Sequence, residues 1–238
     1  MRIGILANSL PATRDVYDEV KPAAGDVFVL LCPTHGRSRT ADLARHFARL
    51  ILKKGRWKSL RMMAAGKIVR LAKPLDDSET IAQLEAMRLD LGLHKSGNIY
   101  REATIECFRI GILNAHIGLL PQYRGRSVME WSLLQGDPVG ISVFFIDTGI
   151  DTGKRIVMSE PVDVSHCKSI SEAKEYLFRL DGQFYRAAIE RLQAEDATYQ
   201  ENDGSGRRYY VMSRLFQGVA EKCLAARSVD KLNLKSQI

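Results

Sequence analysis

The chain has 238 residues, enough for one α/β domain with a short extension but too few for two full-sized domains with separate cores. Hydrophobic residues make up 45% and charged residues 26% of the sequence, which is typical of a globular protein and excludes a disordered or fibrous chain. The longest apolar runs, such as residues 27–32, are far shorter than the roughly 20 residues that a membrane-spanning helix needs. We therefore expect a protein without a transmembrane segment.

The charge is distributed unevenly along the chain. The net charge of +7 depends on residues 45–73, which contain ten Lys or Arg and no acidic residue. Such a block attracts nucleic acid, an anionic membrane surface or a polyphosphate ligand through Coulomb forces. It is equally typical of a solvated helix face whose long side chains cover apolar neighbours. The sequence leaves both interpretations open.

The start of the chain and the cysteines both indicate a cytoplasmic protein. One Arg is followed directly by a β-type apolar run, which is not the pattern of a secretory signal. The cysteines lie far apart without a Cys-x-x-Cys pair, so the sequence suggests neither a metal site nor a disulfide framework. We expect four buried thiols, namely Cys32, Cys107, Cys167 and Cys223.

In the first half of the chain, strands alternate with helices. Apolar runs at 2–7 and 26–32 predict two buried strands joined by a polar connection. Apolar residues at helical spacing predict a helix at 40–52. Asp76, three residues before Glu79, is predicted to be the N-cap of a further helix.

The second half continues the alternation. A helix is predicted at 128–134, and a long amphipathic helix is predicted from a capping box at Ser169 and Glu172 to about residue 195. Further strands are predicted at 89–93, 109–114, 140–146 and 155–158. The pattern favours an α/β fold with a Rossmann-like, doubly wound and mostly parallel sheet.

The loop-like segment 201–206 divides the chain. We expect one α/β domain at residues 1–200 and a short C-terminal extension at 201–238. The extension starts with the β-prone residues 209–211 and then becomes helical. It is too small to fold alone, so we expect it to pack on the body or on a partner subunit.

Asn114 and His116 end one of the predicted strands. Their spacing of two places them on the same face of that strand. In an open α/β sheet the reactive crevice lies beyond the carboxyl ends of the strands, where this pair would lie. An amide can donate a hydrogen bond to an oxyanion, and imidazole suits proton transfer near neutral pH. The pair is therefore a candidate catalytic site.

The strand at 140–146 runs into two Asp-Thr-Gly turns that begin at Asp147 and Asp151. A carboxylate there can orient and charge-stabilise His116. Each signal alone has an ordinary alternative, because a single His is often structural and an Asp before Thr-Gly is often a turn former. The combination favours catalysis over these alternatives.

The motif Asn-x-His-x-x-Leu-Leu-Pro-x-x-Arg-Gly, followed by a strand that ends in Ile-Asp-Thr-Gly, resembles the formyltransferases that use 10-formyltetrahydrofolate. Methionyl-tRNA, glycinamide ribonucleotide and nucleotide-sugar formyltransferases belong to this group. The resemblance is sharp at residues 90–156 and faint elsewhere. It implies a Rossmann-like fold, places the family's catalytic residues on Asn114, His116 and Asp151, and requires no metal.

The resemblance also implies roles for these residues. An acceptor amine attacks the formyl carbon, His116 accepts its proton, Asn114 stabilises the oxyanion, and Asp151 positions the imidazole and favours its charged form. The positions that correspond to folate contacts are Gly92, Leu93, Lys95, Gly97, Phe145, Asp147, Gly149 and Ile150. Those expected near the acceptor are Asn8, Ser9, Gly118, Leu120 and Arg124.

Departures from the family pattern bear on the acceptor. The Gly-rich phosphate loop of the glycinamide ribonucleotide enzymes is absent after the first strand, and only 32 residues follow Gly206, fewer than the tRNA-binding barrel needs. Gly118 stands where the family often has Ser. We therefore expect a nucleotide-linked amino sugar as acceptor, with a charged tRNA or a non-catalytic folate- or nucleotide-binding module as alternatives. A homodimer, and weak membrane or nucleic-acid contact through 45–73, also remain open.

Overall fold

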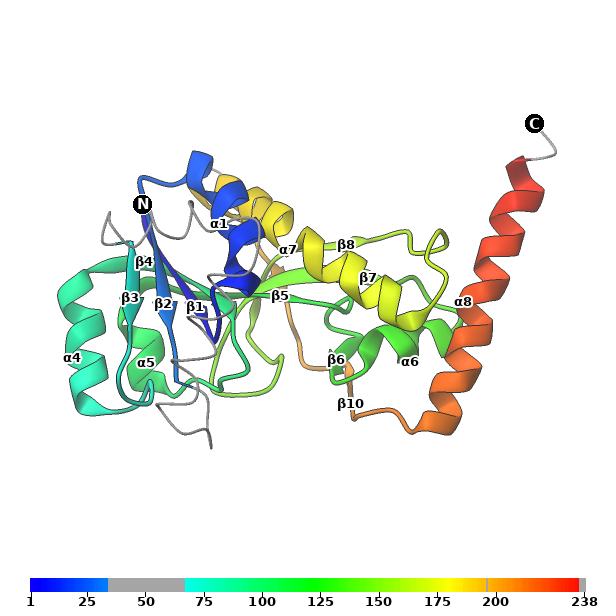
Figure 1. Cartoon of the computed structure of the whole chain (residues 1–238), viewed down its shortest axis with the longest axis horizontal. Helices are drawn as coiled ribbons and strands as arrows, with labels where there is room; N and C mark the ends of the chain where they lie inside the picture. Colours follow the sequence, from blue (N-terminus) through cyan, green and yellow to red (C-terminus); the bar gives the residue numbers. More distant parts are fainter. Residues whose placement is uncertain (34–66, 196, 236–238) are drawn as a thin grey trace. The chain divides into compact units, whose positions relative to one another are not determined.

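In the computed structural model, residues 1–33, 67–195 and 197–235 are described, and they form strands and helices in alternation (Figure 1). The strands are β1 (Arg2–Ala7), β2 (Asp26–Leu31), β3 (Ile68–Arg70), β4 (Leu89–Lys95), β5 (Phe108–His116), β6 (Tyr123–Gly125), β7 (Gly140–Phe145), β8 (Arg155–Pro161), β9 (Gln200–Glu201) and β10 (Arg207–Tyr209). The helices are α1 (Arg14–Val20), α4 (Ser78–Met87), α5 (Glu102–Glu106), α6 (Val128–Gln135), α7 (Ile170–Gln193) and α8 (Arg214–Lys235), with short 3-10 turns at Pro11–Thr13 and Lys21–Ala23.

Eight of these strands form one sheet in the order β3-β2-β1-β4-β5-β7-β8-β9. The pairs from β3 to β5 are parallel, whereas β7, β8 and β9 pair antiparallel. The prediction of a Rossmann-like α/β fold with a mostly parallel sheet is confirmed. A second sheet pairs β6 with β10 in parallel.

The chain divides into two compact units, Met1–Leu113 and Asn114–Ile238. In the first unit, β1 lies between β2 and β4, so its side chains are buried along almost its whole length. Ile5, Leu91 and Leu93 are completely buried there. Parallel strands covered on both faces have such continuous apolar sequences because neither face meets water.

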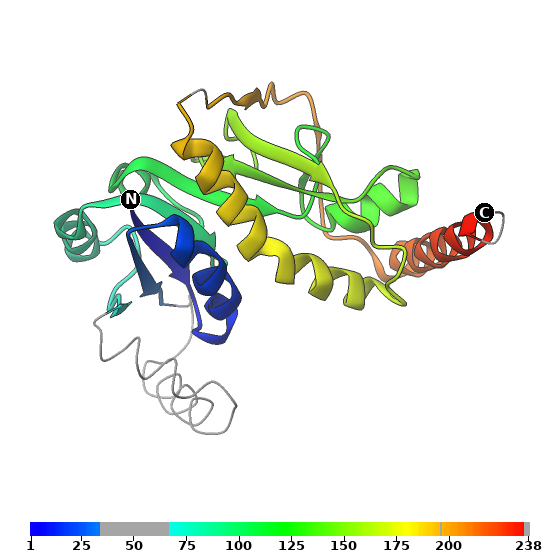
Figure 2. The same ribbon diagram turned by 90° about the horizontal axis from the view of Figure 1, so that it is seen from above.

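In the second unit, helix α7 packs along β7 and β8 (Figure 2), and α8 packs against α6 and α7. Leu133 of α6, Leu177 of α7 and Leu224 of α8 are buried in one hydrophobic cluster. Helix α8 therefore shares a core with the helices that precede it in this unit. The predicted boundary between a body and an extension at residue 200 stays a prediction.

Several elements differ from the sequence prediction. Strands β4 and β5 extend beyond the predicted ends, to Lys95 and His116. Helix α4 is capped by Asp77, whose Oδ1 accepts from the amide of Glu79 at 3.0 Å, and not by Asp76. A cap residue must have extended backbone next to the first helical turn, and this conformation falls one residue later than the spacing predicted.

Short elements were not predicted at all: α1, β3, α5, β6 and β9. They have two to seven residues each, which is too short for a periodic pattern to be recognised. The predicted helix at 40–52 and most of the basic segment 45–73 lie outside the described residues. None of the helices in the described part is long and apolar enough to span a bilayer.

Candidate active site

His116 lies at the carboxyl end of β5 and is held between two oxygen atoms. Its imidazole Nε2 lies 2.9 Å from the main-chain carbonyl of Tyr123, and its Nδ1 lies 3.6 Å from Oδ2 of Asp151. The side chains of His116 and Asp151 are only 9% and 12% exposed, so their electrostatic interaction is poorly screened by water. The structure thus brings together two of the three residues predicted to be catalytic.

The two partners of His116 are both hydrogen-bond acceptors. A carbonyl and a carboxylate can each accept one N–H, and only the charged imidazolium carries an N–H on both ring nitrogens. The surroundings of His116 therefore provide an acceptor for each N–H that the ring can carry.

Asp151 is fixed through both its side chain and its main chain. Its Oδ2 accepts from the amide of Gly125 at 2.9 Å. Its carbonyl accepts from the side-chain amide of Asn202 at 3.2 Å, and the same amide also bonds the carbonyl of Gly153. The backbone of Asp151 has a φ of 52°, a left-handed conformation that non-glycine residues seldom adopt. These contacts hold the strained turn that directs the carboxylate at His116.

Asp147 has a different role in the turn. Its Oδ1 accepts from the amide of Gly149 at 2.9 Å and from the Thr152 hydroxyl at 2.7 Å. Both bonds are local to the loop and are typical of an Asp that stabilises a turn. Of the two Asp-Thr-Gly carboxylates, the one that faces His116 belongs to Asp151.

Asn114 precedes His116 by two residues and is half-buried. Within the described part of the chain, its side-chain amide has no protein partner. The main chain between the two residues is anchored, because the amide of Ala115 donates to the buried Tyr185 hydroxyl at 3.0 Å. Asn114 therefore offers an N–H donor on a fixed strand end, two residues before His116.

The absence of a side chain at residue 118 makes room for the imidazole. A Cβ at Gly118 would lie 2.7 Å from His116 Nε2, 2.7 Å from the Tyr123 carbonyl and 2.9 Å from a methyl group of Val128. Real Cβ atoms do not approach so closely. Any side chain at residue 118, Ser included, would require His116 or Tyr123 to move.

Two of the residues predicted near the acceptor lie after His116. The Leu120 side chain is buried in a cluster with Phe144 and Ile156, and its amide donates to the Ser142 hydroxyl at 2.9 Å. Arg124 is half-buried in β6, and its Nε is buried without a partner in the described part of the chain. Arg124 is therefore better suited to a polar contact with a ligand than Leu120.

In the first unit, Asn8 is hydrogen-bonded to Gly97, a residue predicted to contact folate. Its Oδ1 accepts from the amide of Gly97 at 2.9 Å, and its Nδ2 donates to the Cys32 carbonyl at 3.4 Å. A cavity of about 360 Å³ lies next to Gly97. Ser9 follows Asn8 and is half-buried.

The other predicted folate positions divide into buried and exposed ones. Gly92 and Leu93 lie inside the sheet, where a Cβ at Gly92 would approach Ile112 to 2.9 Å. Lys95, Gly97 and Gly149 are at least partly exposed, and Ile150 is 40% exposed. Phe145 is buried beneath the Arg155 guanidinium, which lies 4.0 Å from the ring centre. Of these exposed positions, Lys95 and Ile150 carry side chains that a ligand could contact, whereas Gly97 and Gly149 offer main-chain groups.

Sequence analysis missed three residues that hold the candidate site: Tyr123, Gly125 and Asn202. Tyr123 and Gly125 act through main-chain atoms, which leave no signature in side-chain identity. Asn202 lies 51 residues after the carbonyl that it binds, in a segment that reads as a loop. A contact of this separation has no local signal in the chain.

Comparison with known proteins identifies the family of the chain. The profile of the family described as Formyl transferase matches residues 35–189, more than half of the chain. The chain belongs to the formyl transferase family. The family prediction made from the sequence is confirmed.

Relatives of this formyl transferase are distant. Methionyl-tRNA formyltransferase of Parabacteroides distasonis is 27% identical over 131 residues, which cover 55% of this chain and 40% of that protein. The chain spans about 40% of the length of the first curated relatives it matches.

Solved structures share its fold. A 4-N formyltransferase from Francisella tularensis has a TM-score of 0.62 at 15% identity, with 94% of this chain and 87% of that one covered. The formyltransferase PseJ from Anoxybacillus kamchatkensis has a TM-score of 0.58 at 15% identity, with 96% and 100% covered. That structure is a complex with UDP-4,6-dideoxy-4-formamido-L-AltNAc and tetrahydrofolate.

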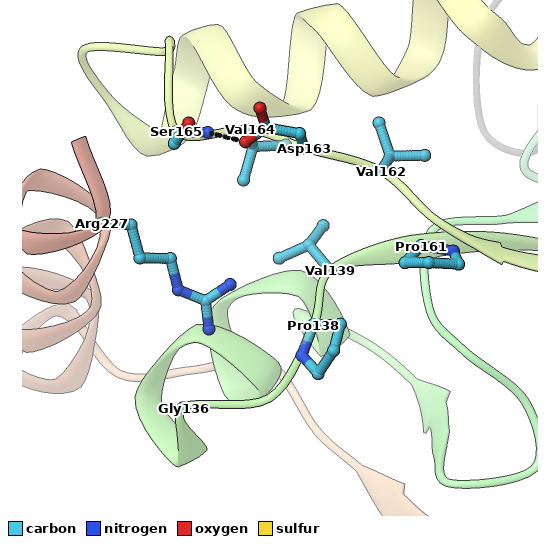
Figure 3. A pocket seen from close by; sticks show the side chains of 9 residues that line it. All are labelled: Gly136, Pro138, Val139, Pro161, Val162, Asp163, Val164, Ser165 and Arg227. Carbon is cyan, nitrogen blue, oxygen red and sulfur yellow. Dashed lines mark hydrogen bonds between the residues drawn. The ribbon is translucent and has the colours of Figure 1, made fainter. Parts of the chain in front are cut away.

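A separate cavity in the second unit of this formyl transferase has a volume of about 450 Å³ (Figure 3). It lies between Arg227 of α8, the turn at Gly136–Val139 and the segment Pro161–Ser165, and it contains none of the predicted site residues. Arg227 donates to the Asp137 carbonyl at 2.6 Å, and Asp163 accepts from the Ser165 amide at 2.9 Å. These two hydrogen bonds hold the turn and the loop that line the cavity.

Within the described ranges, no group of three or more His, Cys, Asp or Glu side chains is arranged to hold a metal ion.

Proposed function

We propose that this formyl transferase moves a formyl group from 10-formyltetrahydrofolate to the amino group of an acceptor. The observation that carries the proposal is the buried His116–Asp151 pair at the end of β5, next to the free amide of Asn114. An acid–base group and an oxyanion donor on one strand end are what acyl transfer to an amine requires.

The donor set fits a formyl group. The folate, when bound, supplies a formyl carbon that is open to attack by an amine nitrogen. The Asn114 amide can donate to the oxygen of that group as it becomes an oxyanion, and it has no competing partner in the described part of the chain. Because β5 is anchored at Ala115, this donor needs little reorganisation during the reaction.

His116 is proposed to receive the proton that the acceptor amine loses. Once the ring is charged, both N–H groups face acceptors, the Tyr123 carbonyl and the Asp151 carboxylate. Asp151 compensates the positive charge in a site that excludes most water. The proton can then pass to the folate nitrogen that leaves the formyl carbon, which returns the ring to its neutral form.

We propose that the folate lies against Gly92, Leu93, Lys95 and Gly97 through main chain, and against Phe145, Asp147, Gly149 and Ile150. The exposed Ile150 and the exposed turn at Gly149 support apolar and main-chain contacts. Asp147 is proposed to act through the loop conformation that its hydrogen bonds maintain.

We propose a nucleotide-linked amino sugar as the acceptor, held with the help of Asn8, Ser9, Gly118, Leu120 and Arg124. The structure of PseJ in complex with a UDP-linked sugar and tetrahydrofolate supports this class of acceptor. The structural match to this chain covers the whole of PseJ. The unpartnered Arg124 Nε supports a polar or anionic group nearby. A second candidate is a charged tRNA, which is favoured by the methionyl-tRNA formyltransferases among the relatives.

The test is release of tetrahydrofolate from 10-formyltetrahydrofolate in the presence of either acceptor class. Purified protein is assayed with a panel of UDP- and dTDP-linked amino sugars and with methionyl initiator tRNA, and the formylated product is identified by mass spectrometry. We expect turnover with an amino sugar and its loss in His116→Gln. Turnover with tRNA and with none of the amino sugars would identify tRNA as the acceptor. If no acceptor led to release of tetrahydrofolate, the formyl-transfer proposal would be overturned.

A further inference from the structure

The short strand β6 supplies main-chain groups to both members of the candidate pair. The Tyr123 carbonyl accepts from His116 Nε2, and the Gly125 amide donates to Asp151 Oδ2, each at 2.9 Å. A displacement of β6 would therefore alter the positions of the imidazole and the carboxylate at the same time.

Strand β6 lies outside the eight-stranded sheet. In the part of the chain that the structure describes, its ladder partner is β10, with Arg207 opposite Tyr123 and Tyr209 opposite Gly125. The amide of Arg126 extends this pairing by donating to the Tyr209 carbonyl at 3.0 Å. Strand β10 lies beyond the residues that match the family profile, 35–189.

Side chains reinforce the pairing. The Tyr209 ring stacks on Tyr123 with 5.3 Å between the ring centres and 16° between the planes, and it also lies 5.5 Å from Trp131. Gln135 bridges the two tyrosines, because its Oε1 accepts from the Tyr123 hydroxyl at 2.9 Å and its Nε2 donates to the Tyr209 hydroxyl at 2.8 Å.

The Tyr123 hydroxyl is kept as a donor. Burial, together with the hydrogen bond to Asp137, raises the pKa of Tyr123, so the phenol stays protonated at neutral pH. The phenol therefore remains a donor, with Gln135 Oε1 and Asp137 Oδ2 both within hydrogen-bond reach of its one O–H.

The two strands approach too closely to leave space for a side chain between them. A Cβ at Gly125, where φ is 105°, would lie 2.2 Å from the Tyr209 carbonyl oxygen. A Cβ at Gly206, just before β10, would lie 1.4 Å from the Pro121 carbonyl oxygen. The register of β10 against the loop after His116 is therefore tightly restricted.

We propose that β10, acting mainly through Tyr209, is the positioning element of the active site. It holds β6 so that Tyr123 and Gly125 keep His116 and Asp151 in the reactive arrangement. This role rests on the proposed function for its catalytic consequence, while the positioning itself concerns contacts within the protein. The C-terminal segment would thus position catalytic groups that lie within residues 35–189, the part of the chain that matches the family profile.

The experiment compares Tyr209→Leu with Tyr210→Leu in the full chain. The same substitution at the next residue is a matched control, because Tyr210 is 66% exposed and its ring lies 5.3 Å from the guanidinium of the exposed Arg208, while its carbonyl, which the substitution keeps, accepts from Trp131. We expect Tyr209→Leu to lower kcat by roughly tenfold to a hundredfold, the cost of misplacing a catalytic group by about 1 Å. Affinity for 5-formyltetrahydrofolate by calorimetry should change by less than about twofold.

Two-dimensional NMR of the His116 ring nitrogens supplies a second readout. Tyr209→Leu should shift these resonances and alter the pH profile of kcat, whereas Tyr210→Leu should leave both as in the wild type. Tyr209→Phe, which keeps the stacked ring but loses the bond from Gln135, should lie between the wild type and Tyr209→Leu. Wild-type kcat and ring resonances in folded Tyr209→Leu would overturn the proposal.

If Tyr209→Leu does not fold by circular dichroism, Tyr209→Phe and Gln135→Ala take its place, since each removes one part of the bridge from a folded protein. A shifted His116 resonance in both supports the positioning role, and unchanged resonances in both contradict it. If the wild type transfers no formyl group, the proposed function fails, but the ring resonances still decide whether β10 positions His116.

Discussion

At the scale of single residues, the candidate site depends on the contrast between two similar turns. Asp147 and Asp151 both precede Thr-Gly, yet one carboxylate closes its own loop and the other faces an imidazole 3.6 Å away. The two residues also differ in their surroundings, because Asp151 has a left-handed φ of 52° and is held by the Gly125 amide and the Asn202 side chain.

We predict that Asp151→Asn lowers turnover by about two orders of magnitude or more without unfolding the protein. A neutral amide neither stabilises the imidazolium nor selects the ring tautomer. Steady-state kinetics and circular dichroism are the measurements. Asp147→Asn is the control and should cost far less, because the amide oxygen can still accept from Gly149 and Thr152. The reverse ranking of the two folded variants would contradict the assignment of Asp151.

We predict that Gly118→Ser reduces turnover strongly, because its Cβ would approach His116 Nε2 and the Tyr123 carbonyl to 2.7 Å. Either group must move, and both belong to the site. The measurements are kcat and the melting temperature.

Gly218→Ala is the matched control for Gly118→Ser. Residue 218 lies in α8, with no atom within 4 Å of the added Cβ. The substitution should be neutral or stabilise by up to about 1 kcal/mol through helix propensity. Wild-type kinetics in Gly118→Ser would show that the imidazole does not need this space.

At the scale of elements, short segments with few residues make the decisive contacts. Strands β6 and β10 have three residues each, yet they connect the loop after His116 to the C-terminal helix. Longer elements provide the supporting core, and helices α4 and α7 begin at side-chain caps. Ser169 caps α7 by accepting from the Glu172 amide at 3.1 Å, as the capping-box spacing predicted.

We predict that Asp77→Ala destabilises the protein by about 1 kcal/mol, the usual cost of losing an N-cap. The Glu79 amide would lose its acceptor at the start of α4. Urea unfolding followed by circular dichroism measures the change. Asp76→Ala should cost only a few tenths of a kcal/mol, because its ion pair with Arg101 is exposed to solvent. If Asp76→Ala destabilised the protein more than Asp77→Ala, Asp76 would be the N-cap, as the sequence predicted.

At the scale of the whole molecule, burial distinguishes positions that are equivalent by residue type. All four cysteines are free thiols, as their spacing predicted, but they are not equally buried. Cys32, Cys107 and Cys167 lie in the interior, whereas Cys223 on α8 is partly exposed. The expectation of four buried thiols is therefore wrong for Cys223, because the face of α8 that carries it is only partly covered.

We predict that a thiol reagent at pH 8 modifies one cysteine of the native protein rapidly and the other three only after denaturation. Burial raises the pKa of Cys32 to about 12 and also raises the pKa values of Cys107 and Cys167, so these groups stay as unreactive thiols. Absorbance during labelling counts the modified groups. Cys223→Ser should remove the rapid phase, and more than one rapid thiol would contradict the burial described.

The sequence by itself determined the fold class and the candidate catalytic residues. Apolar runs and helical spacing are local, so they predicted the long strands and α7 directly. The motif around Asn114 and His116 was recognisable because catalysis needs particular side chains at a particular spacing along one strand. Such requirements fix the identity and spacing of residues, so they can be recognised from the sequence alone.

Only the tertiary structure decided which groups hold those residues in place. The contacts of Tyr123 and Gly125 use main-chain atoms, and Asn202 and Tyr209 come from segments far along the chain. Main-chain hydrogen bonds tolerate many side chains, and pairing between distant segments depends on the packing of the complete unit. For both physical reasons the support of His116 and Asp151 leaves no local pattern in the sequence.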